Sequence, residues 1–139
     1  WILSVEGVPQ TLTGAMLKIS NNPYVLLLLV NVLLVVVGMF LDSTTAILVI
    51  APILAKPLVA AGVDPVHLGM VVVFNLMIGL LTPPMGLALF LVADIAKVTM
   101  KEVLREMMPY YVPLLVTLGL ITYVPVITTW LPRLAVGGP

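Results

Sequence analysis

The residues best suited to chemistry lie in two short stretches, and the first follows Asp42. Asp42 is followed by Ser43, Thr44 and Thr45, where an almost continuous apolar run ends. A carboxylate surrounded by apolar chain is costly unless it is partnered or hydrated, so Asp42 is interpreted as part of a cation site or as the organiser of a chain reversal. The alternative is that Asp42 caps a helix starting near Thr45, because Asp accepts hydrogen bonds from the first free N–H groups of a helix. The two roles are compatible.

The second stretch is Gly-Leu-Leu-Thr-Pro-Pro-Met-Gly at residues 79–86, in the middle of the charge-free run 66–93. Two adjacent prolines remove two backbone donors and clash with the preceding turn, so the helix is predicted to break between Thr82 and Met85. Such a break offers backbone carbonyls and the Thr82 hydroxyl, which are oxygen ligands that suit a hard cation. The alternative is a proline kink that binds no ligand.

Other polar residues in apolar sequence have simpler interpretations. His67 is interpreted as an interfacial or capping residue, because no second histidine accompanies it and a metal site usually needs several ligands. Asn31 and Asn75 are predicted to make hydrogen bonds between helices rather than to bind ligands. Asp94 and Lys97, about one turn apart, predict a weak local ion pair.

The composition predicts an all-α integral membrane protein. The chain of 139 residues is 62% hydrophobic and 9% charged, whereas a soluble domain has about 25% charged residues. Six basic and six acidic residues cancel and no basic cluster occurs, which excludes a nucleic-acid role. Cysteine is absent, so thiol catalysis and disulfides are excluded. The chain begins at Trp1, and further sequence or partner subunits are expected before it.

A helical hairpin is predicted for residues 24–60. The apolar run 24–41 could nearly cross a hydrocarbon core about 30 Å thick, whereas 46–55 is much too short, and Pro52 and Pro57 prevent its regular extension. The economical solution is a re-entrant pair that enters and leaves the membrane by one face, with its tip within 38–45. The alternative is a simple loop between two full spans.

The remaining chain is divided by composition and by its prolines. Four further elements are predicted: an amphipathic surface connector at 1–23, a broken transmembrane helix at 61–97, a second amphipathic connector at 98–108, and a final transmembrane helix with a tail at 109–139. Basic residues in the second connector predict that it is cytoplasmic, with the hairpin opening to the outside. The apolar part of the last element, 109–130, carries the predicted interface anchors Tyr110, Tyr111, Tyr123 and Trp130.

Four motifs then occur in a fixed order. They are Gly-Met-Phe-Leu-Asp-Ser-Thr-Thr at 38–45, Pro-Ile-Leu-Ala-Lys-Pro at 52–57, Gly-Val-Asp-Pro-Val-His-Leu-Gly at 62–69 and Ile-Gly-Leu-Leu-Thr-Pro-Pro-Met-Gly at 78–86. In order and spacing they resemble the C-terminal half of the large membrane subunit of the tripartite ATP-independent periplasmic (TRAP) transporters, the DctM-type permease. The resemblance covers essentially the whole chain.

The resemblance implies sodium-coupled import of organic acids, such as C4-dicarboxylates or sialic acid, and no enzymatic activity. It implies one repeat of an elevator-type ion-transporter fold, in a multi-pass subunit of a bacterial or archaeal inner membrane. The implied partners are a small DctQ-type membrane subunit, a periplasmic DctP-type substrate-binding protein, membrane lipid and the organic acid. No cofactor is implied, and Na⁺ enters as the coupling ion.

The resemblance also assigns residues. Carried onto matching positions, the sodium site lies between the hairpin tip and the break, at Gly38, Gly79, Thr82 and Met85, mostly through backbone carbonyls and the threonine hydroxyl. The hairpin tip beside the substrate would be shaped by Asp42, Ser43, Thr44, Pro83 and Pro84. The loaded block is expected to move relative to a scaffold that includes residues 109–130.

Two rival functions remain open at this stage. One is another sodium- or proton-coupled exchanger of the same architecture that works without a binding protein. The other is a channel or membrane anchor with no coupled cycle. An intramembrane enzyme is a distant third, because Asp42 lacks an evident acidic partner and no Ser/Lys pair has convincing helical spacing.

Overall fold

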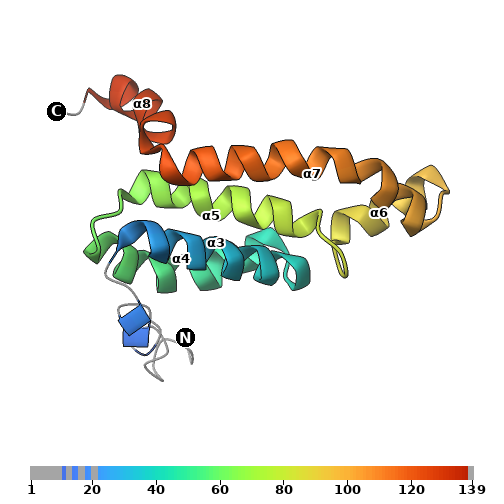
Figure 1. Cartoon of the computed structure of the whole chain (residues 1–139), viewed down its shortest axis with the longest axis horizontal. Helices are drawn as coiled ribbons and strands as arrows, with labels where there is room; N and C mark the ends of the chain where they lie inside the picture. The colour runs from blue at the N-terminus through green and yellow to red at the C-terminus, as the bar shows by residue number, and fades with distance from the viewer. Residues whose placement is uncertain (1–10, 12–13, 16–17, 20–21, 138–139) are drawn as a thin grey trace.

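The chain is all-helical over the residues that the computed structural model describes, which are 11, 14–15, 18–19 and 22–137. Between residues 22 and 137 it forms six helices and no strand (Figure 1). The helices are α3 (Pro23–Phe40), α4 (Ser43–Ala60), α5 (Pro65–Leu80), α6 (Leu87–Ala96), α7 (Met100–Tyr123) and α8 (Pro125–Val136). The connector predicted at 1–23 falls almost wholly outside the described residues and stays a prediction.

Three helices form the central bundle. Helices α3 and α4 run antiparallel as a hairpin, and α5 packs on both (Figure 1). Helix α6 extends beyond the C-terminal end of α5, and α7 returns along α5. The core between them is aliphatic and almost inaccessible to solvent, with Val30, Leu34, Leu54, Leu58 and Leu76 each exposed by at most 1%. Many large apolar side chains also cover the outside, which is the pattern of a protein whose solvent is lipid.

The hairpin tip lies where the sequence predicts it. Helix α3 ends at Phe40, Leu41 and Asp42 form the whole link, and α4 starts at Ser43. The predicted stop in the second arm is wrong, because α4 continues through Pro52 and Pro57 and reaches the same 18 residues as α3. Packing of α4 against α5 compensates for the two lost backbone bonds. By length and composition both arms could cross a membrane, so re-entry through one face stays a prediction.

The predicted break in the next helix is confirmed. Helix α5 ends at Leu80 and α6 begins at Leu87, which leaves the two prolines in the irregular segment between them. The connector before α5 is shorter than the proline-rich sequence indicated and covers only residues 61–64. Asp64 caps α5, since its Oδ1 accepts from the N–H groups of Val66 and His67 at 2.9 and 3.3 Å.

The boundary predicted between 98–108 and 109–139 is wrong. Helix α7 begins at a capping box of Thr99 and Glu102 and runs without interruption through Pro109 and Pro113. Its first turns are held by Val103, which is buried against Leu89 and Ala93 of α6. The amphipathic segment is therefore the first part of the long helix and not a separate connector.

The expected single apolar span to Trp130 is also wrong. Helix α7 stops at Tyr123, and α8 starts at Pro125 after a bend of 64°. Proline disfavours a helical conformation in the preceding residue, and Val124 accordingly has φ −117° and ψ 81°. The residues interpreted as a tail after 130 continue α8 to Val136.

Two glycines bring the hairpin against the broken helix. A Cβ built on Gly79 would lie 2.7 Å from the Gly38 Cα and 2.7 Å from the Val35 carbonyl oxygen, and a Cβ on Gly38 would lie 3.0 Å from the Leu76 oxygen. The last turns of α3 and α5 thus touch backbone to backbone. This contact requires small residues on both helices and fixes the tip beside the break.

Replacing Gly79 by alanine is expected to separate the two helix ends. The added methyl meets backbone rather than a mobile side chain, so the free energy of unfolding should fall by roughly 1 to 3 kcal/mol. Thermal unfolding of the purified protein in detergent measures this loss. Gly119→Ala in α7, where a Cβ meets nothing within 4 Å, is the matched control and should be neutral or slightly stabilising. Equal stability of the two variants would refute the close contact.

Candidate functional site

The hairpin tip is organised by Asp42. Its Oδ2 accepts from the backbone N–H groups of Thr44 at 3.0 Å and Thr45 at 3.4 Å, so the capping role weighed from the sequence is the one observed. The next residue, Ser43, has a buried hydroxyl oxygen with no hydrogen-bond partner within the described residues. A buried hydroxyl without a partner is costly, which makes Ser43 the polar group at the tip that is available to a ligand.

The end of α5 is closed by Thr82. Its hydroxyl donates to the Ile78 carbonyl at 2.6 Å, and its backbone N–H donates to the Gly79 carbonyl at 2.9 Å. The Gly79 carbonyl, expected to be a free ligand, therefore already accepts a hydrogen bond. The Leu81 backbone N–H also bonds to the Gly79 carbonyl, so at this point the two lone pairs of the Thr82 hydroxyl remain open to a cation.

The prolines leave another carbonyl unpaired, one that the sequence interpretation missed. In a continuous helix the Leu80 oxygen would accept from the N–H of residue 84, but Pro84 has none, and neither has Pro83. No hydrogen bond to the Leu80 or Thr82 carbonyl occurs within residues 22–137. Both oxygens lie beside Gly86, at 2.9 and 2.8 Å from the point that a Cβ on this residue would occupy. The absence of a side chain at position 86 thus leaves room between two free acceptors.

Tyr111 of α7 binds one further carbonyl of this segment. Its hydroxyl donates a short hydrogen bond to the Leu81 oxygen. The sequence interpretation as an interface anchor is therefore wrong for Tyr111, because the phenol turns inward and supports the break. A single tyrosine among four gives no sequence signal for this role, which depends on α7 returning along α5.

Some of the predicted site residues are in contact, whereas others only share a segment or lie exposed nearby. Gly38 and Gly79 are in contact, and Thr82 lies one turn beyond Gly79. Pro83, Pro84 and Met85 are exposed in the same irregular segment, and Thr44 is an exposed residue of the first turn of α4. No group of three or more His, Cys, Asp or Glu side chains that could hold a metal occurs in the described part of the chain. A cation held here would therefore be bound by carbonyl and hydroxyl oxygens.

A second polar group is buried in the other half of the bundle. The Asn75 side-chain amide donates to the Asn31 oxygen at 2.7 Å, and the Asn31 amide donates to the Thr122 hydroxyl at 2.9 Å. This joins α5, α3 and α7, as predicted for the two asparagines. The expected capping role of His67 is wrong: the side chain is 3% exposed, with Nδ1 2.8 Å from the Thr128 hydroxyl and Nε2 3.0 Å from the Thr122 carbonyl. Its place near the membrane interface stays a prediction.

These contacts attach the C-terminal half of α7 to the bundle. Tyr111, in the middle of the helix, bonds to the break, and Thr122, near its C-terminal end, bonds to α3 and α5. Sliding of α7 against α5 would expose Asn31, Asn75 and His67 without partners in an apolar environment. This geometry argues against α7 as part of a separate scaffold and groups it with the hairpin and the broken helix.

The apolar helices and the irregular backbone beside the hairpin tip are those of an integral membrane protein with a broken helix. The chain belongs to the family described as "Tripartite ATP-independent periplasmic transporter, DctM component", which matches residues 1–127.

Relatives agree with this assignment. The sialic acid TRAP transporter large permease of Vibrio cholerae is 43% identical over 137 residues, covering 99% of this chain and 32% of the relative. The C4-dicarboxylate TRAP transporter large permease of the same organism is 38% identical, covering 98% and 30%. The isethionate TRAP transporter permease of Oleidesulfovibrio alaskensis is 38% identical, covering 91% and 20%. The chain therefore spans about a third or less of the length of these curated relatives.

Tyr111→Phe is expected to loosen the break without changing the packing of the ring. Removal of the hydroxyl leaves the Leu81 carbonyl unpaired and should lower the free energy of unfolding by about 1 kcal/mol. Tyr110→Phe is the matched control, because Tyr110 is 62% exposed and its hydroxyl makes no hydrogen bond within the described residues. Thermal unfolding of the full-length permease in detergent distinguishes the two, and a loss as large in the control would contradict the assignment.

Thr122→Val tests the buried polar group. The substitution keeps the shape but removes the acceptor for the Asn31 amide, and a loss of about 1 to 2 kcal/mol in unfolding free energy is expected. Thr117→Val serves as control, since the Thr117 hydroxyl bonds only to the Pro113 carbonyl of its own helix. If hydrogen–deuterium exchange of α3 and α5 is the same in both variants, the network does not join these helices.

Proposed function

We propose that this chain is the ion- and substrate-binding C-terminal part of a TRAP transporter large permease that imports an organic acid together with Na⁺. The observation that carries the proposal is the pair of unpaired carbonyls, those of Leu80 and Thr82, which converge beside Gly86 in a member of this family. The relatives named for sialic acid and C4-dicarboxylates make an organic acid the substrate class.

Oxygen atoms around the break provide the proposed sodium site. The Thr82 hydroxyl and the Leu80 and Thr82 carbonyls supply the ligands, and the Gly38–Gly79 contact sets the distance from the hairpin tip. A cation at this position offsets the partial negative charges of the carbonyls, which are otherwise unpaired in an apolar setting. Met85, assigned from the resemblance through its backbone carbonyl, belongs to the same segment.

The organic acid is proposed to bind beside the cation, at donors from both elements. The N-terminus of α4 is already occupied by Asp42, which accepts from Thr44 and Thr45. The N-terminus of α6 has no side-chain cap, because its N-cap is Gly86, so its first N–H groups and the positive end of its dipole remain available to a carboxylate. The unpartnered Ser43 hydroxyl adds a donor from the tip.

Coupling follows if each ligand completes the site of the other. Sodium fixes the break next to the tip and places the α6 N-terminus, while the bound carboxylate adds negative charge near the cation. Each then favours the bound state of the other by the same free energy. The hairpin, the broken helix and α7 are proposed to move as one block against parts of the permease that lie outside this chain.

The proposed assembly is that of the family. A small membrane subunit and a periplasmic substrate-binding protein are the proposed partners, and a bacterial or archaeal inner membrane is the proposed location. No bound cofactor is required. A coupled exchanger without a binding protein and an uncoupled channel remain the alternatives, and sodium-independent uptake of the organic acid by the reconstituted permease would favour the channel.

Thr82→Val tests the ion site in proteoliposomes that contain the whole transporter. Loss of one oxygen ligand should raise the sodium concentration for half-maximal uptake about tenfold, which corresponds to about 1.4 kcal/mol. Thr82→Ser keeps the hydroxyl and should retain the wild-type value. Because the Thr82 hydroxyl also closes α5, thermal unfolding without sodium is measured for both variants. Unchanged sodium dependence in a folded Thr82→Val variant would exclude Thr82 as a ligand.

A further inference from the structure

A second recess lies at the opposite end of α5 from the break. Its volume is about 240 Å³, and it opens where α3 and α5 begin and where α7 bends into α8. Its lining includes the polar side chains of Asp64, His67, Thr122, Thr129 and Arg133. The 16 residues of α5 separate it from the candidate ion site, so the two sites are distinct.

The polar groups at the base of this recess already have hydrogen-bond partners within the protein. Both ring nitrogens of His67 are hydrogen-bonded to α7 and α8, and the Thr129 hydroxyl donates to the Pro125 carbonyl at 2.8 Å. These groups form a fixed base and leave recognition to the charges at the rim.

The rim carries one charge of each sign. Asp64 uses Oδ1 to cap α5, while Oδ2 accepts no hydrogen bond in the described part of the chain. Arg133, on α8, is exposed, and its guanidinium makes no ion pair or hydrogen bond to any described side chain. A carboxylate and a guanidinium thus face one recess without pairing with each other. A ligand that carries both charges satisfies them together, whereas a purely anionic ligand is repelled by Asp64.

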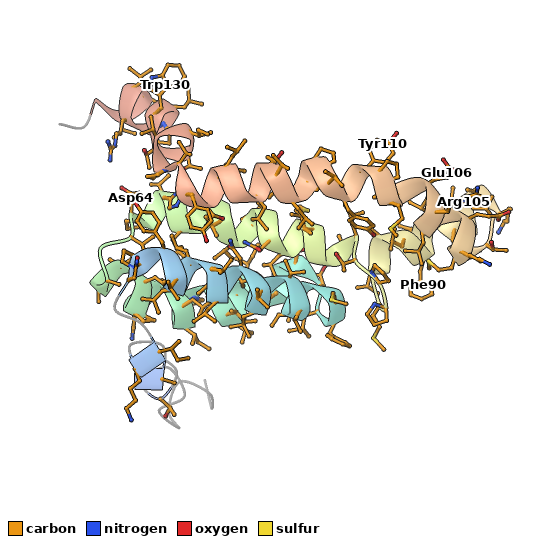
Figure 2. All side chains as sticks on the ribbon, in the orientation of Figure 1. Asp64, Phe90, Arg105, Glu106, Tyr110 and Trp130 are labelled. Carbon is orange, nitrogen blue, oxygen red and sulfur yellow. The ribbon has the colours of Figure 1, made fainter. Side chains whose placement is uncertain are left out.

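The residues around the recess are typical of the level of lipid head groups. Helix α8 turns 64° away from α7 and presents an exposed apolar stripe at helical spacing, made by Ile127, Trp130, Leu131 and Leu134. Asp64 and Trp130 lie at the same end of the molecule (Figure 2). The rings of Tyr24 and Tyr123 meet there with centroids 5.9 Å apart, and aromatic residues are typical of membrane interfaces.

We propose that this recess binds the head group of a zwitterionic aminophospholipid, of which phosphatidylethanolamine is the simplest. The lipid phosphate pairs with Arg133 and the ammonium group pairs with Asp64, while the acyl chains extend from the recess into the bilayer. Arginine suits a phosphate because its planar donors form two parallel hydrogen bonds. The lipid would join α8 to the start of α5 across the bend.

The test is lipid retention by the full-length permease in nanodiscs of defined composition. Native mass spectrometry after detergent extraction should show a retained phosphatidylethanolamine in preference to phosphatidylglycerol or phosphatidylcholine. Arg133→Gln should reduce this retention about fivefold, equivalent to about 1 kcal/mol for one basic residue near a lipid phosphate, and Arg133→Lys should restore much of it. Asp64→Asn keeps a capping oxygen and should abolish the preference over phosphatidylglycerol while leaving the protein folded.

Two results would overturn the proposal. One is equal retention of the three lipids by the wild type and by both charge variants. The other is occupation of the recess by protein, which a photoreactive residue at position 130 detects as a crosslink to another part of the permease or to the small subunit instead of to lipid. Sodium-dependent uptake, measured in parallel, separates this lipid site from the ion site, because Thr82→Val should leave lipid retention unchanged.

Discussion

The structure depends on how unpaired backbone groups are accommodated in an apolar molecule. Each unsatisfied N–H or carbonyl costs several kcal/mol in hydrocarbon, so an irregular segment persists there only with partners at hand. The segment between α5 and α6 has three kinds of partner: Thr82 closes the preceding helix, Tyr111 takes the Leu81 carbonyl, and a cation is proposed for the remaining acceptors. The hairpin tip, the long helix and the glycine contact are all arranged around this segment.

The parts of the fold that the sequence predicts are those set by local chemistry. Two adjacent prolines cannot continue a helix, and Asp42 followed by hydroxyl residues has the composition of a helix start, so the break and the tip were both placed correctly. The resemblance to the family already assigned Gly38 and Gly79 to one site, at which the two residues are in contact. The pairing of these particular turns depends on the register of α3 against α5, which no local pattern encodes.

The errors share a physical cause. The single prolines at 52, 57 and 109 do not end helices as expected, because tertiary packing holds α4 and α7 helical through them. The expected span to Trp130 did not include the effect of Pro125, which moves Val124 out of the helical conformation and ends α7. The roles of Tyr111 and His67 arise only when α7 lies along α5, so their partners are far away in the sequence.

The grouping of α7 with the hairpin changes the expected division of the permease. If α7, which polar contacts attach through its C-terminal half, moves with its neighbours as proposed, the sliding surface would lie on the outer faces of this bundle. In the described part of the chain those faces carry many exposed apolar side chains, which suits the proposed movement.

The shortness of the hairpin link has its own mechanical consequence. With only Leu41 and Asp42 between two 18-residue arms, α3 and α4 have no slack at the tip and cannot part there without unwinding. A gate made from this hairpin would therefore move as one rigid body. Its pivot would fall at the far end, where Gly62 with φ +97° forms the turn into α5 and has open space around it.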